Sequence, residues 1–392
     1  MTNKKKILFF TSRIPYPLEK GDKLRAFYQI KYLSKSCNIV LCCISQEELS
    51  EKAKKALGKY TSSIHVYKTS KLSLTLNMLT AGLMNFPFQV GFFFNTGAHF
   101  FFNKIIKKEK PDHIFVQLIR MAEYVSKIKS IPKSLDYMDT FSKGIERRMN
   151  KSSGIKKQIF KFEFNRLKKY EERVYNWFEN TYIISEQDKQ SFAFENAKGI
   201  KVLPNGVDHD FFQPNDLTQK KYDLVFTGNM SYPPNISAVL YIAKEIMPIL
   251  LNKNPNIKLL IAGATPTNSV KALANKNIKV SGWIDDIRDA YNEAKVFIAP
   301  LQIGTGLQNK LLEAMSMEVP CITSQLANNA LGAKNGEEIL IGKSPEDYAE
   351  AVFKLLKDVS LNKKIVQNGK RFVTQSYNWS TITKNLEKDF FK

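Results

Sequence analysis

The sequence predicts an α/β protein built from two Rossmann-like domains, each with a parallel sheet. Apolar runs of strand length alternate with helical patterns of about 10–15 residues, which is typical of parallel sheets joined by helices. The chain has 392 residues, enough for two domains of about 100–200 residues each. Prolines and a glycine separate two series of strand–helix units. We therefore expect a first domain at 1–204, a linker at 205–221, a second domain at 222–370 and a C-terminal helix at 371–392.

The first domain opens with four consecutive apolar residues at 7–10, which fit a strand that is covered on both faces. A loop with two prolines and Gly21 follows, and then a helix with an apolar stripe from Leu24. This start is half of a mononucleotide-binding unit, but without GxGxxG a dinucleotide is not indicated. Arg13 in the loop could face a phosphate or remain solvated. The predicted strands of this domain are 6–11, 39–45, 64–67, 112–117, 133–139, 181–185 and 201–204.

The second domain has three loops that follow strands, and ligands of open α/β sheets bind at that edge. These loops are 228–235, 282–286 and 304–313. The last one opens a helix, whose free N–H groups can bind a phosphate. Lys310 can add a positive charge, and Glu313 can accept hydrogen bonds from ribose hydroxyls. An ordinary turn with a solvated Lys and Glu fits these ten residues equally well. The predicted strands are 223–228, 257–263, 280–283, 296–300 and 319–323.

Acidic residues and cysteines give no metal site. Asp139 stands near the end of a predicted strand, where it could contact a ligand or instead cap the next helix. Asp208, His209 and Asp210 match a metal-binding DxD pattern, but no other acidic cluster is nearby, and we regard the match as chance. The four cysteines form no CxxC pair. Neither a zinc site nor a disulfide framework is therefore indicated, which fits a reducing cytosol.

The charge of the chain is strongly basic and uneven. Its net charge is +22, and residues 1–220 hold 38 of the 59 Lys and Arg but only 21 of the 37 Asp and Glu. A strongly basic N-terminal part attracts nucleic acid, anionic lipid or phosphorylated substrates, although a lysine-rich genome would give the same excess of positive charge. Residues 155–179 predict a long helix with an apolar stripe and a basic face. That helix fits either an anionic membrane surface or a core position with a solvated basic face.

No stretch of the sequence predicts a membrane-spanning helix. Residues 72–102 contain no Asp, Glu, Lys or Arg, but glycines and a proline interrupt them, so we expect two short helices around a loop. The apolar run at the N-terminus breaks at Thr11, too early for a signal peptide. We expect a cytoplasmic protein that could bind the inner face of the plasma membrane peripherally.

Several segments resemble glycosyltransferase family 4, whose members are retaining enzymes with the GT-B fold. Residues 201–208 (KVLPNGVD) resemble its linker signature. Residues 282–286 (GWIDD) with the strand at 296–301 resemble its nucleobase loop, and residues 304–324 resemble its donor-binding segment. Residues 13–25 are similar to a subgroup of bacterial sugar transferases associated with exopolysaccharide and exosortase-linked gene clusters. The resemblance covers most of the chain.

The resemblance implies an activity, a fold and a set of partners. It implies two sheets that face each other across a cleft, with the C-terminal helix crossing back to the first domain. It implies that a sugar moves from a nucleotide-diphosphate donor to a glycan or lipid-linked acceptor with retention of anomeric configuration. Neither a cofactor nor a metal ion is required in this reading.

The resemblance also assigns roles to residues of the second domain. Glu313 matches the second glutamate of the family's EX7E pattern, which binds the donor ribose. Thr305 stands in place of the first glutamate, so a carboxylate usually placed near the donor sugar is missing. Lys310 and the main chain of 304–308 would stabilise the leaving diphosphate. The segment contributes Gly304, Thr305, Gly306, Leu307 and Gln308 to donor binding.

Other implied contacts come from the remaining loops. Gly228 and Asn229 stand where many members have Gly-Arg, and either Lys310 or Arg13 from across the cleft could replace that arginine. Gly21 would let the first loop approach the donor phosphates. Main-chain groups of Trp283 and Ile284 would hold the base. Asp139 is a candidate for acceptor contact, and no general base is nominated.

Three other functions fit parts of the sequence. A nucleotide-sugar epimerase of the same fold would need acid/base histidines, but the chain has four His, none of them in the donor motifs. A nucleic-acid-binding protein would explain the charge, but no RNA- or DNA-binding motif accompanies it, and we do not expect nucleic acid as a partner. A catalytically idle GT-B paralogue that acts as a basic membrane-bound partner would explain Thr305.

Overall fold

The computed structural model describes residues 4–70, 86–303 and 306–391. The chain forms two compact units. The first unit comprises Met1–Pro204 and Trp379–Lys392, and the second unit comprises Asn205–Asn378. The predictions for Gly304 and Thr305, and the first part of the prediction for 72–102, lie outside the described residues.

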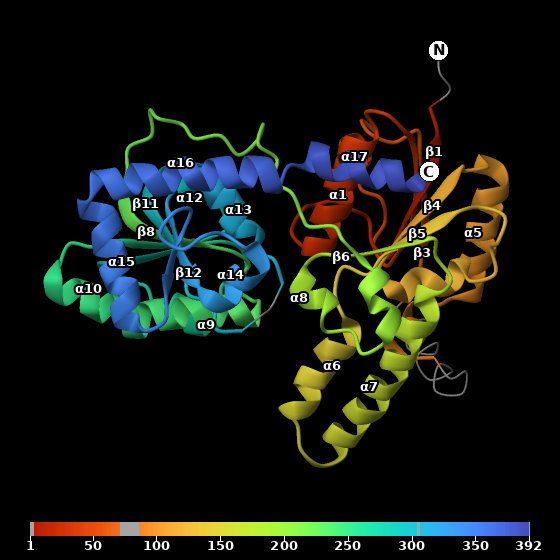
Figure 1. The fold of residues 1–392 in the computed structure, drawn as a ribbon, viewed down its shortest axis with the longest axis horizontal. Helices are drawn as coiled ribbons and strands as arrows, with labels where there is room; N and C mark the ends of the chain where they lie inside the picture. The colour runs from red at the N-terminus through yellow and green to blue at the C-terminus, as the bar shows by residue number, and fades with distance from the viewer. Residues whose placement is uncertain (1–3, 71–85, 304–305, 392) are drawn as a thin grey trace. The chain divides into compact units, whose positions relative to one another are not determined.

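The first unit is built on a seven-stranded parallel sheet in the order β3-β2-β1-β4-β5-β6-β7 (Figure 1). The central strand β1 is fully apolar at its middle, and Phe9 pairs with Leu41 on one side and Phe115 on the other. Because helices cover both faces, these side chains are buried. The strands are β1 (Lys6–Thr11), β2 (Asn38–Ser45), β3 (Ser63–Lys68), β4 (His113–Gln117), β5 (Lys133–Asp136), β6 (Asn180–Ile183) and β7 (Lys201–Val202).

Helices form two apolar cores, one on each face of this sheet. The C-terminal helix α17 (Trp379–Phe390) belongs to the first unit and packs on α1 (Gly21–Leu33), where the rings of Tyr28 and Trp379 stack at 5.7 Å. The C-terminal helix was expected to begin at residue 371, but the preceding helix α16 includes that residue and ends at Ser376. The other helices of the unit are α2 (Glu51–Leu57), α4 (Phe88–Phe93), α5 (Thr96–Glu109), η1 (Ile119–Val125), α6 (Phe141–Asn150), α7 (Gly154–Tyr175), α8 (Glu186–Lys189) and η2 (Glu195–Gly199).

A buried ion pair links α1 to the sheet of the first unit. Arg25 Nε donates to Asp136 Oδ2 at 2.6 Å, and both side chains are completely buried. Gln29 Nε2 donates to the same oxygen at 3.2 Å, and Arg25 also donates to the carbonyl of Leu203. Arg25 lies in the basic stretch after the first loop, but its contacts are those of the core.

The second unit repeats this topology with a six-stranded parallel sheet in the order β10-β9-β8-β11-β12-β13. In both sheets the first strand of the unit lies in the middle and the chain winds outward in two directions, as in Rossmann folds. The predicted α/β class with two Rossmann-like sheets is confirmed. The strands are β8 (Tyr222–Thr227), β9 (Leu259–Ala262), β10 (Ile278–Gly282), β11 (Ala294–Ala299), β12 (Cys321–Ser324) and β13 (Leu340–Gly342). The last of these was not predicted.

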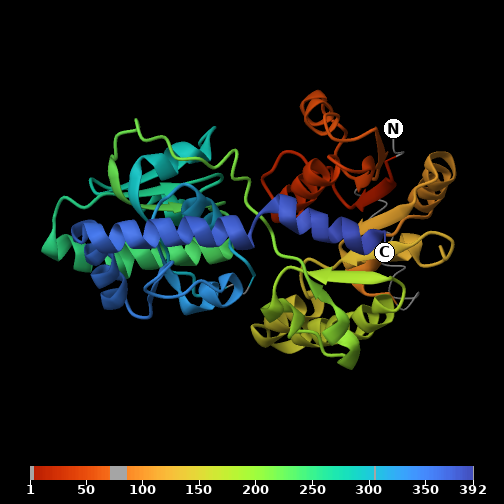
Figure 2. The same ribbon diagram turned by 45° about the horizontal axis from the view of Figure 1, so that its top comes forward.

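Helices of the second unit cover both sides of its sheet (Figures 1 and 2). Within the described residues one helical stretch, Pro233–Lys253, is long and apolar enough to cross a membrane, and 44% of its most apolar window is buried in the protein. It contains a π-helical turn before Pro248, at the place where the proline predicts a kink. The helices are α9 (Pro233–Tyr241), η3 (Ile242–Ile246), α10 (Met247–Lys253), α11 (Asn268–Lys271), α12 (Ile287–Asn292), α13 (Asn309–Ser316), α14 (Gln325–Leu331), α15 (Pro345–Lys357) and α16 (Val359–Ser376).

Candidate active site

The second unit brings Lys310, Asn235 and Gly228 together at the carboxyl edge of its sheet. Lys310 lies in the first turn of α13, and its Nζ donates to Asn235 Oδ1 at 2.5 Å. The same Nζ lies 4.2 Å from the centre of the Phe226 ring. A Cβ at residue 228 would stand 2.8 Å from Lys310 Nζ. The glycine after β8 therefore leaves the space that the ammonium group occupies.

The pKa of the Lys310 ammonium group is close to neutral pH. Burial lowers its pKa to about 7, and the negative charge of Glu313 opposes this shift. Lys310 forms no ion pair with a side chain in the described parts of the chain. An anionic ligand could supply the counter-charge, and it would favour the protonated form.

Two glycines let neighbouring loops approach each other next to this lysine. Gly228 has a φ of +151° and Gly263 a φ of +143°, which side-chain-bearing residues rarely adopt. A Cβ on Gly263 would stand 1.8 Å from the carbonyl oxygen of Gly228. Asn229 joins the same loops, because its Oδ1 accepts from Thr265 Oγ1 at 2.8 Å and from Ser231 N at 2.9 Å. Asn229 thus fixes the loop with its side chain.

Glu313 lies one helical turn after Lys310 and is held in place by Tyr291. Tyr291 Oη donates to Glu313 Oε2 at 2.8 Å and lies 2.8 Å from Thr227 Oγ1. Burial raises the pKa of Glu313, while the hydrogen bond from Tyr291 and the charge of Lys310 oppose this rise. A carboxylate has about four lone-pair sites, so the group can also accept from ligand hydroxyls.

The start of α13 has no side-chain cap hydrogen bond from its N-cap residue. Gln308 is the N-cap residue, but its side chain makes no cap hydrogen bond and instead donates from Nε2 to the carbonyl of Gly306 at 2.8 Å. Leu307 between them is buried. The first turn also lacks an acidic residue. Main-chain N–H groups at the start of a helix, here beside Lys310, can bind an anion.

An exposed indole stands on the loop after β10. Trp283 is 66% exposed, and its Nε1 donates to Asp285 Oδ1 at 3.0 Å. Gly282 before it has a φ of +71°, Ile284 after it is half-buried, and Asp286 caps α12. An indole in this position can stack on a flat ring such as a base.

The linker packs along α13 through its polar side chains. Asn205 Nδ2 donates to Asn309 Oδ1 at 3.0 Å, and His209 Nδ1 lies 3.1 Å from Ser316 Oγ. The histidine of the DxD-like sequence thus contacts α13. No group of three or more His, Cys, Asp or Glu that could hold a metal ion is found among the residues described.

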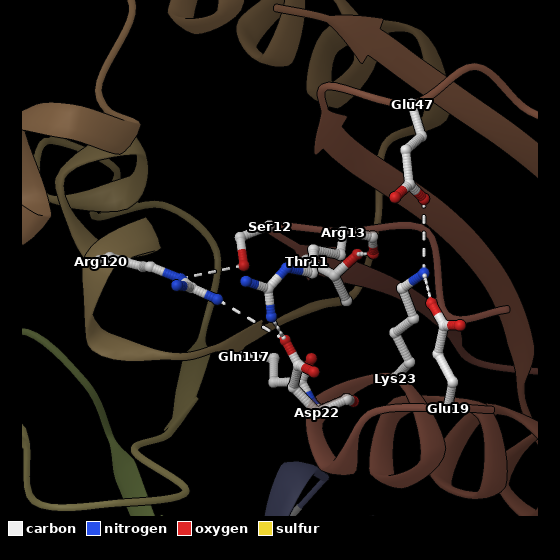
Figure 3. A network of polar contacts seen from close by, with 9 residues as sticks. All are labelled: Thr11, Ser12, Arg13, Glu19, Asp22, Lys23, Glu47, Gln117 and Arg120. Carbon is white, nitrogen blue, oxygen red and sulfur yellow. Dashed lines mark hydrogen bonds and ion pairs between the residues drawn. The ribbon is translucent and has the colours of Figure 1, made fainter. Parts of the chain in front are cut away.

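In the first unit, Arg13 belongs to a polar network at the carboxyl edge of the sheet (Figure 3). Its Nη1 forms an ion pair with Asp22 Oδ2 at 2.5 Å. Arg120 lies 3.6 Å from the same oxygen and donates from Nε to Ser12 Oγ at 3.0 Å. Burial lowers the pKa of Arg120 to about 9; the charge of Arg13 adds to this shift and that of Asp22 opposes it. Asp22 therefore already neutralises part of the charge that Arg13 brings.

A depression of about 160 Å³ opens beside this network in the first unit. Lys23, another basic residue of this part of the chain, is buried and forms ion pairs with Glu19 and Glu47, so its contacts are structural. A Cβ on Gly21, the first residue of α1, would meet no described atom within 4 Å. The depression is lined by Ser12, Arg13, Lys20, Ile44, Ser45, Gln46, Glu47, Thr69 and Phe93.

Asp139 lies three residues after β5, at the carboxyl end of that strand. The N-cap of α6 is Thr140, so the alternative that Asp139 caps this helix is wrong. Loss of water around the carboxyl group raises the pKa of Asp139 to about 6, and the charge of Asp188 adds to the rise. Because the residue as a whole is exposed, solvent offsets part of this shift.

Four residues at these sites were not nominated from the sequence. They are Asn235, Gly263, Tyr291 and Arg120. Asn235 lies within the predicted ligand loop 228–235, and a glycine after a strand is a signal that could have found Gly263. Tyr291 and Arg120 lack such a signal, because their roles depend on partners distant in sequence.

Comparisons with known proteins agree with this fold. Residues 221–358 match the family described as "Glycosyl transferases group 1". A Klebsiella pneumoniae protein, "Uncharacterized 44.6 kDa protein in cps region", is 24% identical over 98% of this chain and 99% of its own length. The Staphylococcus aureus "Capsular polysaccharide biosynthesis glycosyltransferase CapM" is 29% identical over 52% of this chain and 59% of its own. Anabaena HepE, solved with UDP and glucose, superposes with a TM-score of 0.68 and 14% identity over 98% of this chain and 99% of that one.

The fold is therefore that of the GT-B glycosyltransferases, with two α/β units built on parallel sheets. The second unit, which carries the Lys310 and Glu313 site, matches the glycosyltransferase group 1 family over most of its length.

Proposed function

We propose that this protein is a retaining glycosyltransferase of family 4 type. It transfers a sugar from a nucleoside-diphosphate donor to a glycan or lipid-linked acceptor in the synthesis of a surface polysaccharide or exopolysaccharide. The observation that carries this proposal is the pairing of Lys310 and Glu313, one turn apart on α13, at the carboxyl edge of the second sheet.

The donor phosphates lie beside Lys310 and the free N–H groups at the start of α13. The ribose hydroxyls donate to Glu313, whose orientation Tyr291 fixes. The exposed Trp283 and the main chain of Ile284 hold the base.

Chemistry at this site depends on stabilising the leaving group. The bond between the anomeric carbon and the diphosphate oxygen breaks, and the acceptor oxygen forms a new bond to the same face of that carbon. The acceptor hydroxyl proton passes to the leaving phosphate oxygen, so no separate base is required. Lys310 and the helix N–H groups stabilise the negative charge that develops on the diphosphate. The proposal includes no metal ion or cofactor.

The acceptor belongs to the first unit. The depression beside Arg13 and the exposed Asp139 lie at the carboxyl edge of its sheet, where ligands of such sheets bind. The polysaccharide context rests on the relatives, one from a capsule region and one named for capsule synthesis.

Titration calorimetry of UDP and GDP tests the donor site. The protein is titrated with EDTA present, and then with Mg²⁺, against Glu313→Ala and the matched variant Glu350→Ala. Glu350 is an exposed glutamate on α15 that pairs with Lys354. We expect micromolar binding of one nucleotide without metal, loss of binding in Glu313→Ala, and no change in Glu350→Ala.

Other outcomes would remove parts of the proposal. Absence of binding for both nucleotides, or equal binding by Glu313→Ala, would contradict a donor site. Binding that requires Mg²⁺ would contradict the metal-free mechanism. Nucleotide binding without hydrolysis or transfer of any nucleotide sugar, with crude lipid-linked acceptors present, would favour the idle paralogue. The anomeric configuration of the first-formed product, read by NMR, tests retention.

A further inference from the structure

The tip of the helical hairpin formed by α6 and α7 exposes apolar side chains. Both views show the two helices side by side (Figures 1 and 2). Ile155 is 81% exposed, Ile159 51% and Phe162 53%, and their spacing of four and three residues places them on one face of α7. Farther along the helix the stripe is buried at Leu167 and Val174. One end of α7 is therefore covered by the core while the other presents its apolar face to solvent.

The same tip is basic and contains no acidic residue. Residues 147–161 hold six Lys and Arg and no Asp or Glu. Lys156, Lys157 and Lys161 are exposed, and Lys156 lines one depression together with Ile159, Arg148 and Lys151. The six are Arg147, Arg148, Lys151, Lys156, Lys157 and Lys161. An apolar face among cations is the composition of helices that lie at an anionic membrane interface.

The placement of two of these lysines opposes the helix dipole. Lys156 and Lys157 stand in the first turn of α7, which has no acidic residue and no side-chain N-cap bond. Cations at a helix N-terminus are unfavourable, because that end carries the positive end of the dipole. An anion at this end would relieve the repulsion. Local helix stability therefore does not explain why these residues are basic.

An open depression of about 490 Å³ lies at the tip. Cationic and apolar side chains line it together, which suits a group that is anionic at one end and apolar at the other. The lining residues are Arg148, Lys151, Ser152, Lys156, Ile159 and Phe160. A phospholipid headgroup with the start of its acyl chains has this chemistry.

We propose that residues 147–162 form a membrane-docking tip that binds the surface of an anionic phospholipid bilayer. The lysines attract the headgroups, and Ile155, Ile159 and Phe162 insert among them. The inference stands apart from the donor site, which lies in the second unit. The long basic helix was expected to lie either on an anionic membrane or in the core. Under this proposal one half of α7 belongs to the core and the other half is the docking surface.

Vesicle co-sedimentation of the full chain tests the proposal. Vesicles of pure phosphatidylcholine are compared with vesicles that contain phosphatidylglycerol, at physiological salt. The charge variant is Lys156→Glu/Lys157→Glu, and its control is Lys107→Glu/Lys108→Glu on α5. The apolar variant is Ile155→Ser/Ile159→Ser, and its control is Phe100→Ser, also on α5 and 71% exposed. All substituted side chains are exposed, so the fold is retained, and circular dichroism verifies this.

We expect the wild type to sediment only with anionic vesicles. Each lysine at such a surface contributes about 1 kcal/mol, which is about fivefold in binding, so the charge variant should lose at least about 25-fold. The apolar variant should lose about tenfold or more, and the two α5 controls should change less than about twofold in the same assay.

Three results would overturn the docking tip. They are equal sedimentation with neutral vesicles, equal losses in the tip variants and the α5 controls, and vesicle binding that the tip substitutions leave unchanged. Binding of the tip to RNA or to a protein with no vesicle binding would also overturn it. Nucleotide affinity is measured on the same variants, and the tip substitutions should leave it unchanged. This measurement distinguishes failure of the docking proposal from failure of the donor-site proposal.

Discussion

The charge on Lys310 should make donor binding depend on pH. In the free protein burial lowers the pKa of this lysine to about 7. A bound diphosphate favours the protonated form and raises that pKa, so binding takes up a proton at any pH between the two values. Below pH 7 the lysine is already protonated and affinity is constant. Above pH 7 the affinity falls, because the proton must first be bound.

The size of the effect follows from this pKa. A group with a pKa of about 7 is about 90% charged at pH 6 and about 3% charged at pH 8.5. If the complex restores an ordinary lysine pKa of about 10.4, affinity should fall about 30-fold over this range, or about 2 kcal/mol. The ligand should be a nucleotide sugar, whose diphosphate has no terminal phosphate with a pKa of about 6.

Calorimetry from pH 6 to pH 8.5 measures this loss. Lys310→Met keeps the length of the side chain but removes the titrating group, so its weaker affinity should not vary with pH. Lys244→Met, at an exposed lysine of the same unit, should retain the wild-type profile. A wild-type affinity that is flat over this range, or a Lys310→Met affinity that still falls, would refute the role of this ammonium group.

Three further predictions follow from single contacts. Glu313→Gln should weaken donor binding about tenfold, because a charge-assisted bond to ribose is lost, and calorimetry with unchanged affinity would exclude ribose contact. Gly263→Ala should destabilise the second unit by more than about 3 kcal/mol in denaturant unfolding, since its Cβ would stand 1.8 Å from a neighbouring carbonyl oxygen. Its control, Gly144→Ala in an open helical position, should instead raise the free energy of unfolding by about 0.5–1 kcal/mol. Asp136→Asn should cost about 3–5 kcal/mol by removing the buried carboxylate charge that pairs with Arg25, and a melting temperature within 2 °C of wild type would contradict this.

Strands of the two sheets could be predicted because each is a short apolar run with both faces buried. Residues 7–10 and 296–299 are examples, and all of their side chains are completely buried. Strand β13 was missed because Leu340–Gly342 is three residues long and only its last residue is buried. The periodicity of such a short edge strand does not differ from that of a turn.

The position of the candidate donor site could be predicted from the sequence, but the contacts between its residues could not. A glycine-bearing turn that opens a helix with Lys310 and Glu313 is visible in ten consecutive residues. Asn235, which holds the lysine, is 75 residues away, and Tyr291, which holds the glutamate, is 22 residues away. Contacts between residues so distant in sequence depend on which strands are neighbours in the sheet, and no local sequence pattern predicts the strand order.

Helix α7 shows the same limit from another side. Its apolar stripe is continuous in the sequence from Ile155 to Val174, and hydrophobic periodicity treats all of it alike. In the folded protein the stripe is buried at Val174 and bare at Ile155. A pattern can identify which face of a helix is apolar, but only packing decides whether that face is covered. The exposed half is therefore the informative one. Ile155 is 81% exposed, and Phe162 remains 53% exposed although its ring packs on Phe88, so this is the part of the apolar face that the proposed membrane surface would cover.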